Sequence, residues 1–171
     1  GCCHGIPEGR TVRLGDLVTL DIGLFFQEYH TDTSATVVAG KPTASQRRFL
    51  QAGKESVVEA ISVLKPGISV YEISKAMQLR VEKDGYKAVY QLVGHGIGKE
   101  LHEKPSIPCV ANEQDKRVKL EIGQTVAIEI MYAEGDPTLE LDKDGWTYAT
   151  LDGSVTGMFE HTVYLGESGP I

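Results

Sequence analysis

Two stretches of sequence, LGDLVTLDI at residues 14–22 and IGQTVAIEI at residues 122–130, share one pattern. Apolar residues alternate with polar or small ones, which is typical of a strand with one apolar face. The two stretches align without a gap, and Asp21 in the first matches Glu129 in the second. Two β-rich segments can be similar by chance, but the matched carboxylate argues against this. The repeat therefore predicts a pseudo-symmetric fold in which each half supplies one acidic group.

The chain between the repeated strands predicts two helices. Residues 43–64 carry apolar side chains at helical spacing and are followed by a Pro-Gly pair, which ends a helix. A second helix is expected from Ser69 to Gly85, because Ser69 and Glu72 have the spacing of a capping box. The glycine-rich segment GHGIG at 94–98 predicts a loop.

Strands are expected on both sides of these helices. Residues 17–26 have an apolar residue at every even position, which predicts a half-buried strand with that face turned inward. Further strands are expected at residues 28–39, 124–132 and 158–165. This order predicts an α+β fold, in which an antiparallel sheet carries helices on one face.

Composition limits the class of protein. The 171 residues are expected to form a single domain over 1–171. The net charge is -7, from 17 basic and 24 acidic residues, so neither nucleic acid nor an anionic membrane is an expected partner. The apolar runs are too short to span a bilayer. Three cysteines do not make a secreted disulfide framework, so we expect a reducing, cytoplasmic location. The chain begins with Gly1, which indicates a processed or incomplete chain and leaves an organellar location open.

Four acidic residues stand inside segments that otherwise favour strands: Asp21, Asp32, Glu129 and Glu160. A lone acidic residue of this kind usually lies on a solvated face. A hairpin, however, would set Asp21 and Asp32 side by side, and the repeat relates Asp21 to Glu129. Four carboxylates in one site would repel one another, and a bound cation is a common reason to gather them.

His95 adds a nitrogen donor to this set. It lies between two glycines, where an exposed loop histidine is the simpler alternative. Two aspartates, two glutamates and one histidine make an oxygen-rich set, unlike the cysteine and histidine ligands of structural zinc. Such a set suits Mn, Fe or Co, or Zn in a catalytic site. It also suits two divalent ions bridged by carboxylates.

Two more histidines, His4 and His102, lie outside the acidic strands. We therefore expect both to contact a substrate rather than a metal. A loose N-terminal residue is the alternative for His4.

Five motifs, in order along nearly the whole chain, resemble those of type I methionine aminopeptidases. They are CHGIP (3–7), LDIG with HTDTS (20–34), GHGIG with LHEKP (94–105), IEIM (128–131) and FEHT (159–162). GWTYATLDGS at 145–154 also matches this family. The resemblance implies the pseudo-symmetric "pita-bread" α+β fold and two divalent metal ions (Co, Mn, Fe or Zn).

The resemblance also implies a role for each candidate residue. Asp21 would chelate one metal, and His95 with Glu129 would complete the other site. Asp32 and Glu160 would bridge the two ions. The ions would activate a water molecule for attack on the peptide bond after an N-terminal methionine. The substrates would be the N-termini of peptides and nascent proteins.

Substrate contacts follow from the same resemblance. Glu129 would act as the base, and His102 would stabilise the oxyanion. His4 would contact the substrate near the scissile amide, and Trp146 would help to wall the methionine pocket. Leu101 stands where relatives have Phe before the second histidine, so it is expected to contact substrate as well.

This chain also departs from the family pattern. It lacks the segment that precedes CHGIP in relatives, so the methionine pocket is expected to be incomplete. Ile130 replaces a Pro that relatives carry after the glutamate of the fourth motif. We expect a monomer, with a swapped or oligomeric state as the alternative if the missing segment exposes apolar surface.

Two other functions fit the same fold. One is a metallopeptidase that cleaves Xaa-Pro bonds, although the HEKP context after GHGIG favours the methionine type. The other is an inactive or truncated pita-bread protein that acts as a binding module. The complete set of five candidate ligands argues for an enzyme.

Overall fold

The computed structural model describes residues 1–6 and 9–171. In this part of the chain the helices are α1 (Ala44–Ser62), α2 (Val70–Lys83) and the short 3₁₀ helix η1 (Glu113–Arg117). The strands are β1 (Leu17–Phe26), β2 (Tyr29–Val38), β3 (Lys87–Ala88), β4 (Val93–Gly96), β5 (Glu103–Pro108), β6 (Thr125–Ala133), β7 (Leu139–Leu141), β8 (Tyr148–Thr150), β9 (Thr156–Gly166) and β10 (Gly169–Pro170). They form an antiparallel sheet in the order β1-β2-β9-β6-β4-β5, with β10 on β9 and β3 on β6, and a separate β7-β8 pair.

The repeated sequence has a repeated structure. β1 and β6 lie symmetrically on either side of the central β2-β9 pair. Gly15 and Gly123, which match in the alignment, have nearly equal positive φ values of 92° and 91°. Their N–H groups also make equivalent 2.8 Å hydrogen bonds, to Ala39 O after β2 and to Leu165 O in β9. A glycine is required at both places, because other residues rarely adopt this backbone conformation.

Both predicted helices are present and begin at capping boxes. In α1 the Thr43 side chain accepts a hydrogen bond from the Gln46 N–H, and in α2 the Ser69 side chain accepts one from the Glu72 N–H. Each N3 side chain bonds back to the N-cap backbone, so two orphan donors are satisfied at each helix start. Among the described residues, no helix is both long and apolar enough to cross a membrane.

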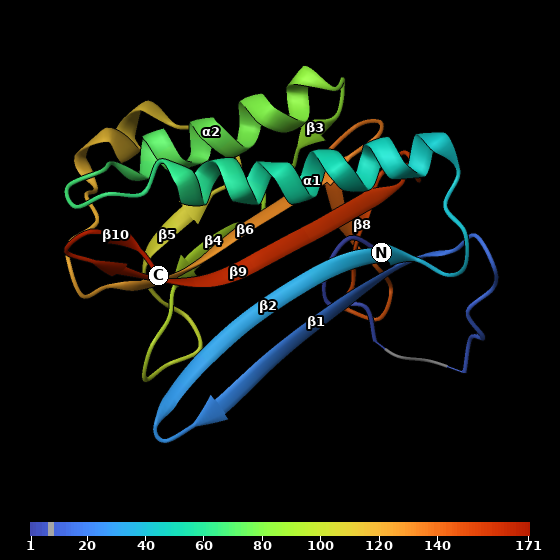
Figure 1. The fold of residues 1–171 in the computed structure, drawn as a ribbon. Helices are drawn as coiled ribbons and strands as arrows, with labels where there is room; N and C mark the ends of the chain where they lie inside the picture. Colours follow the sequence, from blue (N-terminus) through green and yellow to red (C-terminus); the bar gives the residue numbers. More distant parts are fainter. Residues whose placement is uncertain (7–8) are drawn as a thin grey trace.

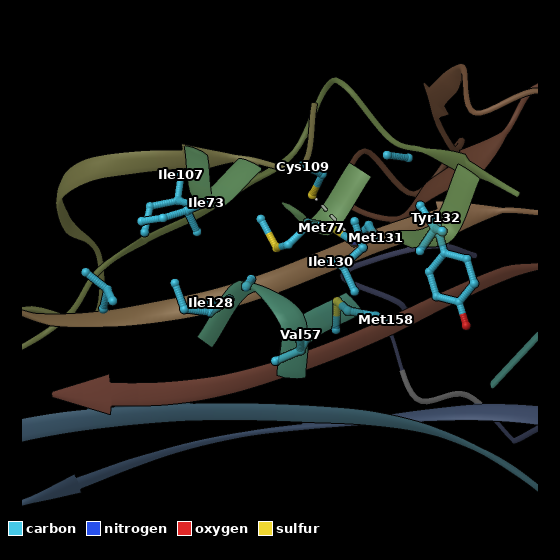
Figure 2. Close-up of a cluster of buried hydrophobic side chains, with 14 of the residues drawn as sticks. Val57, Ile73, Met77, Ile107, Cys109, Ile128, Ile130, Met131, Tyr132 and Met158 are labelled. Carbon is cyan, nitrogen blue, oxygen red and sulfur yellow. Dashed lines mark hydrogen bonds between the residues drawn. The ribbon is translucent and has the colours of Figure 1, made fainter. Parts of the chain in front are cut away.

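The two helices lie over the same face of the sheet, with α1 against β6 and β9 and α2 against α1, β3 and β5 (Figure 1). Ile128 and Ile130 of β6 are fully buried in the core beneath them. Figure 2 shows these side chains in one cluster with Val57 of α1 and Met77 of α2. The alternation of β6 thus places its even positions under the helices and its odd positions on the opposite face.

The prediction that the even face of β1 turns inward is wrong. Leu20 and Ile22 are each 54% exposed, and Phe26 is 73% exposed. The reason lies in the arrangement: α1 packs against β6 and β9, whereas the β1-β2 hairpin extends beyond the two helices (Figure 1). The apolar pattern is therefore the same in both repeated strands, but only β6 has a helical layer against it.

This difference gives a testable prediction for stability. Ile130→Ala should lower the free energy of unfolding by about 2–5 kcal/mol, because it opens a cavity in a packed core. Its repeat partner makes a matched control: Ile22→Ala should change stability by only about 0.5 kcal/mol, as for an exposed position. Urea denaturation of the three chains measures both values.

Equal losses at the two positions would contradict this description. They would show that the even face of β1 is covered in solution, as in a swapped or oligomeric state.

Candidate metal centre

One row of residues crosses four strands at the centre of the sheet. Asp21 in β1 pairs with Ser34 in β2, Ser34 pairs with Glu160 in β9, and Glu160 pairs with Glu129 in β6. Residues paired in register share a face, and Asp32 lies two residues before Ser34 on that same face. The sheet therefore gathers all four predicted acidic ligands on the face opposite α1 and α2.

Glycines bring His95 to this group. The predicted loop at 94–98 is wrong in part, because residues 94–96 belong to β4, with a bulge between His95 and Gly96. A Cβ on Gly94 would lie 2.5 Å from Ala127 O, and one on Gly96 would collide with the Lys104 backbone. The glycines therefore allow β6 and β5 to approach β4 closely, and they fix His95 beside β6.

Asp32, His95 and Glu160 form the tightest cluster. Each offers a ligand atom, and these atoms lie within 4.8 Å of one another. His95 Nε2 lies 4.0 Å from Glu160 Oε1. The other ring nitrogen, Nδ1, lies 2.8 Å from Gly96 O, and a carbonyl oxygen only accepts, so Nδ1 donates and Nε2 keeps its lone pair.

Burial sets the charge state of these groups. It lowers the pKa of His95, which favours the neutral ring that binds metals. It raises the pKa values of Glu129 and Glu160, and the neighbouring carboxylates raise them further. The pKa of Asp21 is also raised, first by desolvation and then by Asp32. A bound cation would reverse these effects by favouring the ionised carboxylates.

The residues fit a divalent cation by an independent observation. Glu160 is only 2% exposed, and its Oε1 atom is buried without a hydrogen-bond partner among the described residues. A buried acceptor without a donor is costly, and a cation beside His95 Nε2 would satisfy it. The donor set of carboxylate oxygens and one imidazole suits Mn, Fe, Co or catalytic Zn.

A single cleft of about 920 Å³ is lined by every candidate metal-binding and substrate-binding residue predicted from the sequence. Its lining includes His4, Asp21, Asp32, His95, Leu101, His102, Glu129, Trp146 and Glu160. The His102 ring lies 4.4 Å from the His95 ring between centroids. The His4 ring lies 5.6 Å from the Trp146 ring, and His4 O accepts a hydrogen bond from Thr147 Oγ1. The geometry thus places the predicted substrate residues around the acidic cluster, while their roles stay predictions.

Sequence reasoning missed two residues at this site. Ser34 lies in the row between Asp21 and Glu160, and Thr162 hydrogen bonds to the Asp32 backbone. Both belong to motifs that were recognised, HTDTS and FEHT, but their positions depend on strand register. Pro7, the last residue of CHGIP, lies outside the described residues.

The fold and this acidic, histidine-containing cleft are typical of metallopeptidases. The chain belongs to metallopeptidase family M24, whose family model matches residues 1–167. The pita-bread α+β fold expected from the resemblance is confirmed by solved structures of the same architecture.

Methionine aminopeptidases are prominent among the similar proteins. The methionine aminopeptidase of Aquifex aeolicus is 37% identical over 170 residues, which is 98% of this chain and 66% of that protein. The structure of methionine aminopeptidase from Rickettsia prowazekii superposes with a TM-score of 0.94 at 32% identity, covering 99% of this chain and 68% of that one. This chain therefore spans about two thirds of the length of these relatives.

A second peptidase type shares the fold. Prolidase from Pyrococcus furiosus has a TM-score of 0.76 at 26% identity, covering 98% of this chain and 44% of that one. Both the identity and the structural similarity are lower than for the Rickettsia prowazekii methionine aminopeptidase.

The raised carboxyl pKa values predict a pH dependence of stability in the metal-free chain. Folded Glu129 and Glu160 hold protons at pH values where the unfolded chain, with glutamate pKa values near 4.5, has released them. The folded state then binds more protons, so the free energy of unfolding should fall as the pH is raised from about 4.5 towards neutral. Urea denaturation in chelator across this range measures the slope.

Two variants sharpen this measurement. Glu129→Gln should flatten the slope, because glutamine does not titrate, whereas Glu100→Gln, at an exposed position, should leave the slope as it is. Stability that rises with pH in the parent chain would contradict the assignment.

Proposed function

We propose that this chain binds two divalent metal ions and removes the N-terminal methionine from peptides and nascent proteins. The observation that carries the proposal is the single cleft, where the cluster of Asp32, His95 and Glu160 lies beside two further histidines. The similarity to methionine aminopeptidases over 98% of this chain supports the same reaction.

Five residues would hold the ions: Asp21, Asp32, His95, Glu129 and Glu160. Four carboxylates and one imidazole would supply enough donors to hold two ions. When bound, such ions lower the pKa of water and polarise a carbonyl group.

The chain's own groups would manage the proton and the developing charge. Glu129, which is buried, would accept a proton from the attacking water and pass it to the leaving amine. His102, whose ring lies beside that of His95, would donate a hydrogen bond to the oxyanion that forms on the substrate carbonyl. No protein nucleophile is needed for this hydrolysis.

Three further residues would bind the substrate. His4 is positioned by Trp146 and by the Thr147 hydroxyl, and would contact the peptide near the scissile amide. Trp146 and Leu101 line the cleft and would contact the methionine side chain. Trp146 is 60% exposed, so a bound side chain would find apolar surface there.

The setting of this activity follows from charge and cysteine content. A net charge of -7 fits the N-termini of peptides, which are cationic, and disfavours nucleic acid. The three cysteines are free, in keeping with the proposed reducing, cytoplasmic location.

Peptide hydrolysis tests the proposal directly. The metal-stripped chain should release methionine from Met-Ala-Ser only after Mn, Co, Fe or Zn is added. Bound metal should be counted in the same samples, with about two ions per chain expected.

Other outcomes identify the alternatives. Cleavage of Xaa-Pro peptides in preference to Met-Ala-Ser would indicate the prolidase type. Bound metal without hydrolysis of either peptide would contradict the activity and favour a binding module. Failure to bind metal would overturn the proposal as a whole.

The proposed roles also separate by mutation. His102→Ala should lower kcat by about 10²–10³, as for the loss of one oxyanion donor, while the bound metal stays unchanged. Asp32→Asn should instead weaken metal binding and abolish activity, because a shared carboxylate becomes a neutral amide. Steady-state kinetics with metal counting distinguishes the two patterns.

A matched control is available on the other face of the sheet. His161 is exposed and follows Glu160 in β9, so its side chain points away from the cleft. His161→Ala should leave both kcat and metal content near those of the parent chain. Loss of metal in His102→Ala would show that His102 is a ligand instead.

A further inference from the structure

The β1-β2 hairpin joins the rest of the sheet through a short contact. The β2-β9 ladder has only three paired positions, from Thr33 with His161 to Ala35 with Phe159. By contrast, the β6-β9 ladder pairs nine residues of β6, Thr125 to Ala133. Asp21 and Asp32 lie on the hairpin, whereas Glu129, Glu160 and His95 lie beyond this contact. The relative position of these two groups of candidate ligands therefore depends on the short contact between β2 and β9.

Threonine hydroxyls continue the contact at both ends of the ladder. At one end, Thr162 Oγ1 of β9 accepts a hydrogen bond from Asp32 N at 2.8 Å and donates one to Asp32 O at 2.7 Å. At the other end, Thr36 Oγ1 of β2 accepts from Met158 N at 2.8 Å and donates to Met158 O at 3.0 Å. Each hydroxyl therefore satisfies both backbone groups of the residue opposite, in place of a main-chain pair.

The two threonines differ in what they hold. Thr162 holds the backbone of Asp32, a candidate metal ligand whose side chain belongs to the tight cluster with His95 and Glu160. Thr36 holds Met158, which lies two residues before Glu160 and offers no carboxylate. The neighbouring hydroxyl of Thr33 donates to Glu160 O at 2.9 Å, so the backbone of this second candidate ligand is bonded to β2 as well.

We propose that Thr162 is a positioning residue for the metal centre, which acts by fixing the Asp32 backbone at the distance from β9 that keeps the Asp32 carboxylate in the cluster with His95 and Glu160. The inference rests on the proposed metal site. Without the hydroxyl, the N–H and C=O groups of Asp32 both lose the partner on β9 that the structure gives them among the described residues. Residues that orient a ligand without touching the metal are known to tune metal affinity.

Metal binding by three variants of the whole chain tests this inference. Thr162→Val removes the hydroxyl and keeps the shape, Thr162→Ser keeps the hydroxyl, and Thr36→Val is the matched control at the other end of the ladder. Co²⁺ alone is the probe, because calorimetry gives its affinity and visible absorption reports its coordination.

Thr162→Val should bind Co²⁺ about 10–100-fold more weakly and with a changed visible spectrum, as for the loss of a group that orients a ligand. Thr162→Ser should restore both the affinity and the spectrum. Thr36→Val loses the same two backbone hydrogen bonds and also the 2.8 Å contact with the Thr19 hydroxyl. It should therefore lose stability but keep the affinity and spectrum of the parent chain. Where Thr162→Val does not fold, Thr162→Ala removes the same hydroxyl with less crowding and carries the same expectation.

Several results would overturn the inference. A folded Thr162→Val or Thr162→Ala chain with parental Co²⁺ binding would show that the hydroxyl does not position the ligand. Equal weakening by Thr36→Val would show that the contact between β2 and β9 affects metal binding only through its general stability. If the parent chain itself binds no Co²⁺, the proposed metal site fails and this inference fails with it, which is distinct from failure in the variant alone.

Discussion

Repulsion between carboxylates is the constraint on which this structure depends. Strand register sets Asp21, Glu160 and Glu129 in one row, with Asp32 close by on the same face. Glu160 is almost fully buried, and this burial, together with the neighbouring carboxylates, raises its pKa. Burying several negative charges without a partner is unfavourable, so the metal-free sheet keeps protons that an ordinary glutamate would lose. A bound cation would make the arrangement favourable, so the pattern of acidic residues predicts that the site binds a cation.

The backbone around this row is shaped to tolerate the crowding. Gly94 and Gly96 let three strands approach closely enough for His95 to reach Glu160. Ser34 is a small residue at the centre of the row, where a larger side chain would fill the space between the acidic groups. The hydroxyl of Thr162 replaces a main-chain pair beside Asp32. Small and hydroxylated residues therefore determine where the charged ones lie, although they carry no charge themselves.

Much of the fold could be predicted from local patterns. The strand at residues 17–26, the two helices and the α+β class follow from alternation, from helical spacing and from the capping box at Ser69, and the structure confirms them. β4 was not predicted, because a glycine-rich strand has no alternation to detect and is defined by its neighbours. The ligand types could be identified from acidic residues in β-prone segments. The role proposed for Thr162 could not be predicted from the sequence, because it depends on which residues of β2 and β9 lie opposite each other.

The repeat shows why pattern alone does not determine burial. β1 and β6 share their alternation, their glycine turns and a carboxylate at the same position, yet Ile130 is fully buried and Ile22 is 54% exposed. Alternation tells which side chains share a face, whereas burial depends on what lies against that face. The acidic row lies on the opposite face of the same strands. Which acidic residues come together there is therefore set by the register between neighbouring strands and not by the helices. The geometry of the candidate ligands and the stability of the hairpin therefore depend on different faces of β1. A substitution on the apolar even face can change the stability of the hairpin and leave the ligand geometry unchanged.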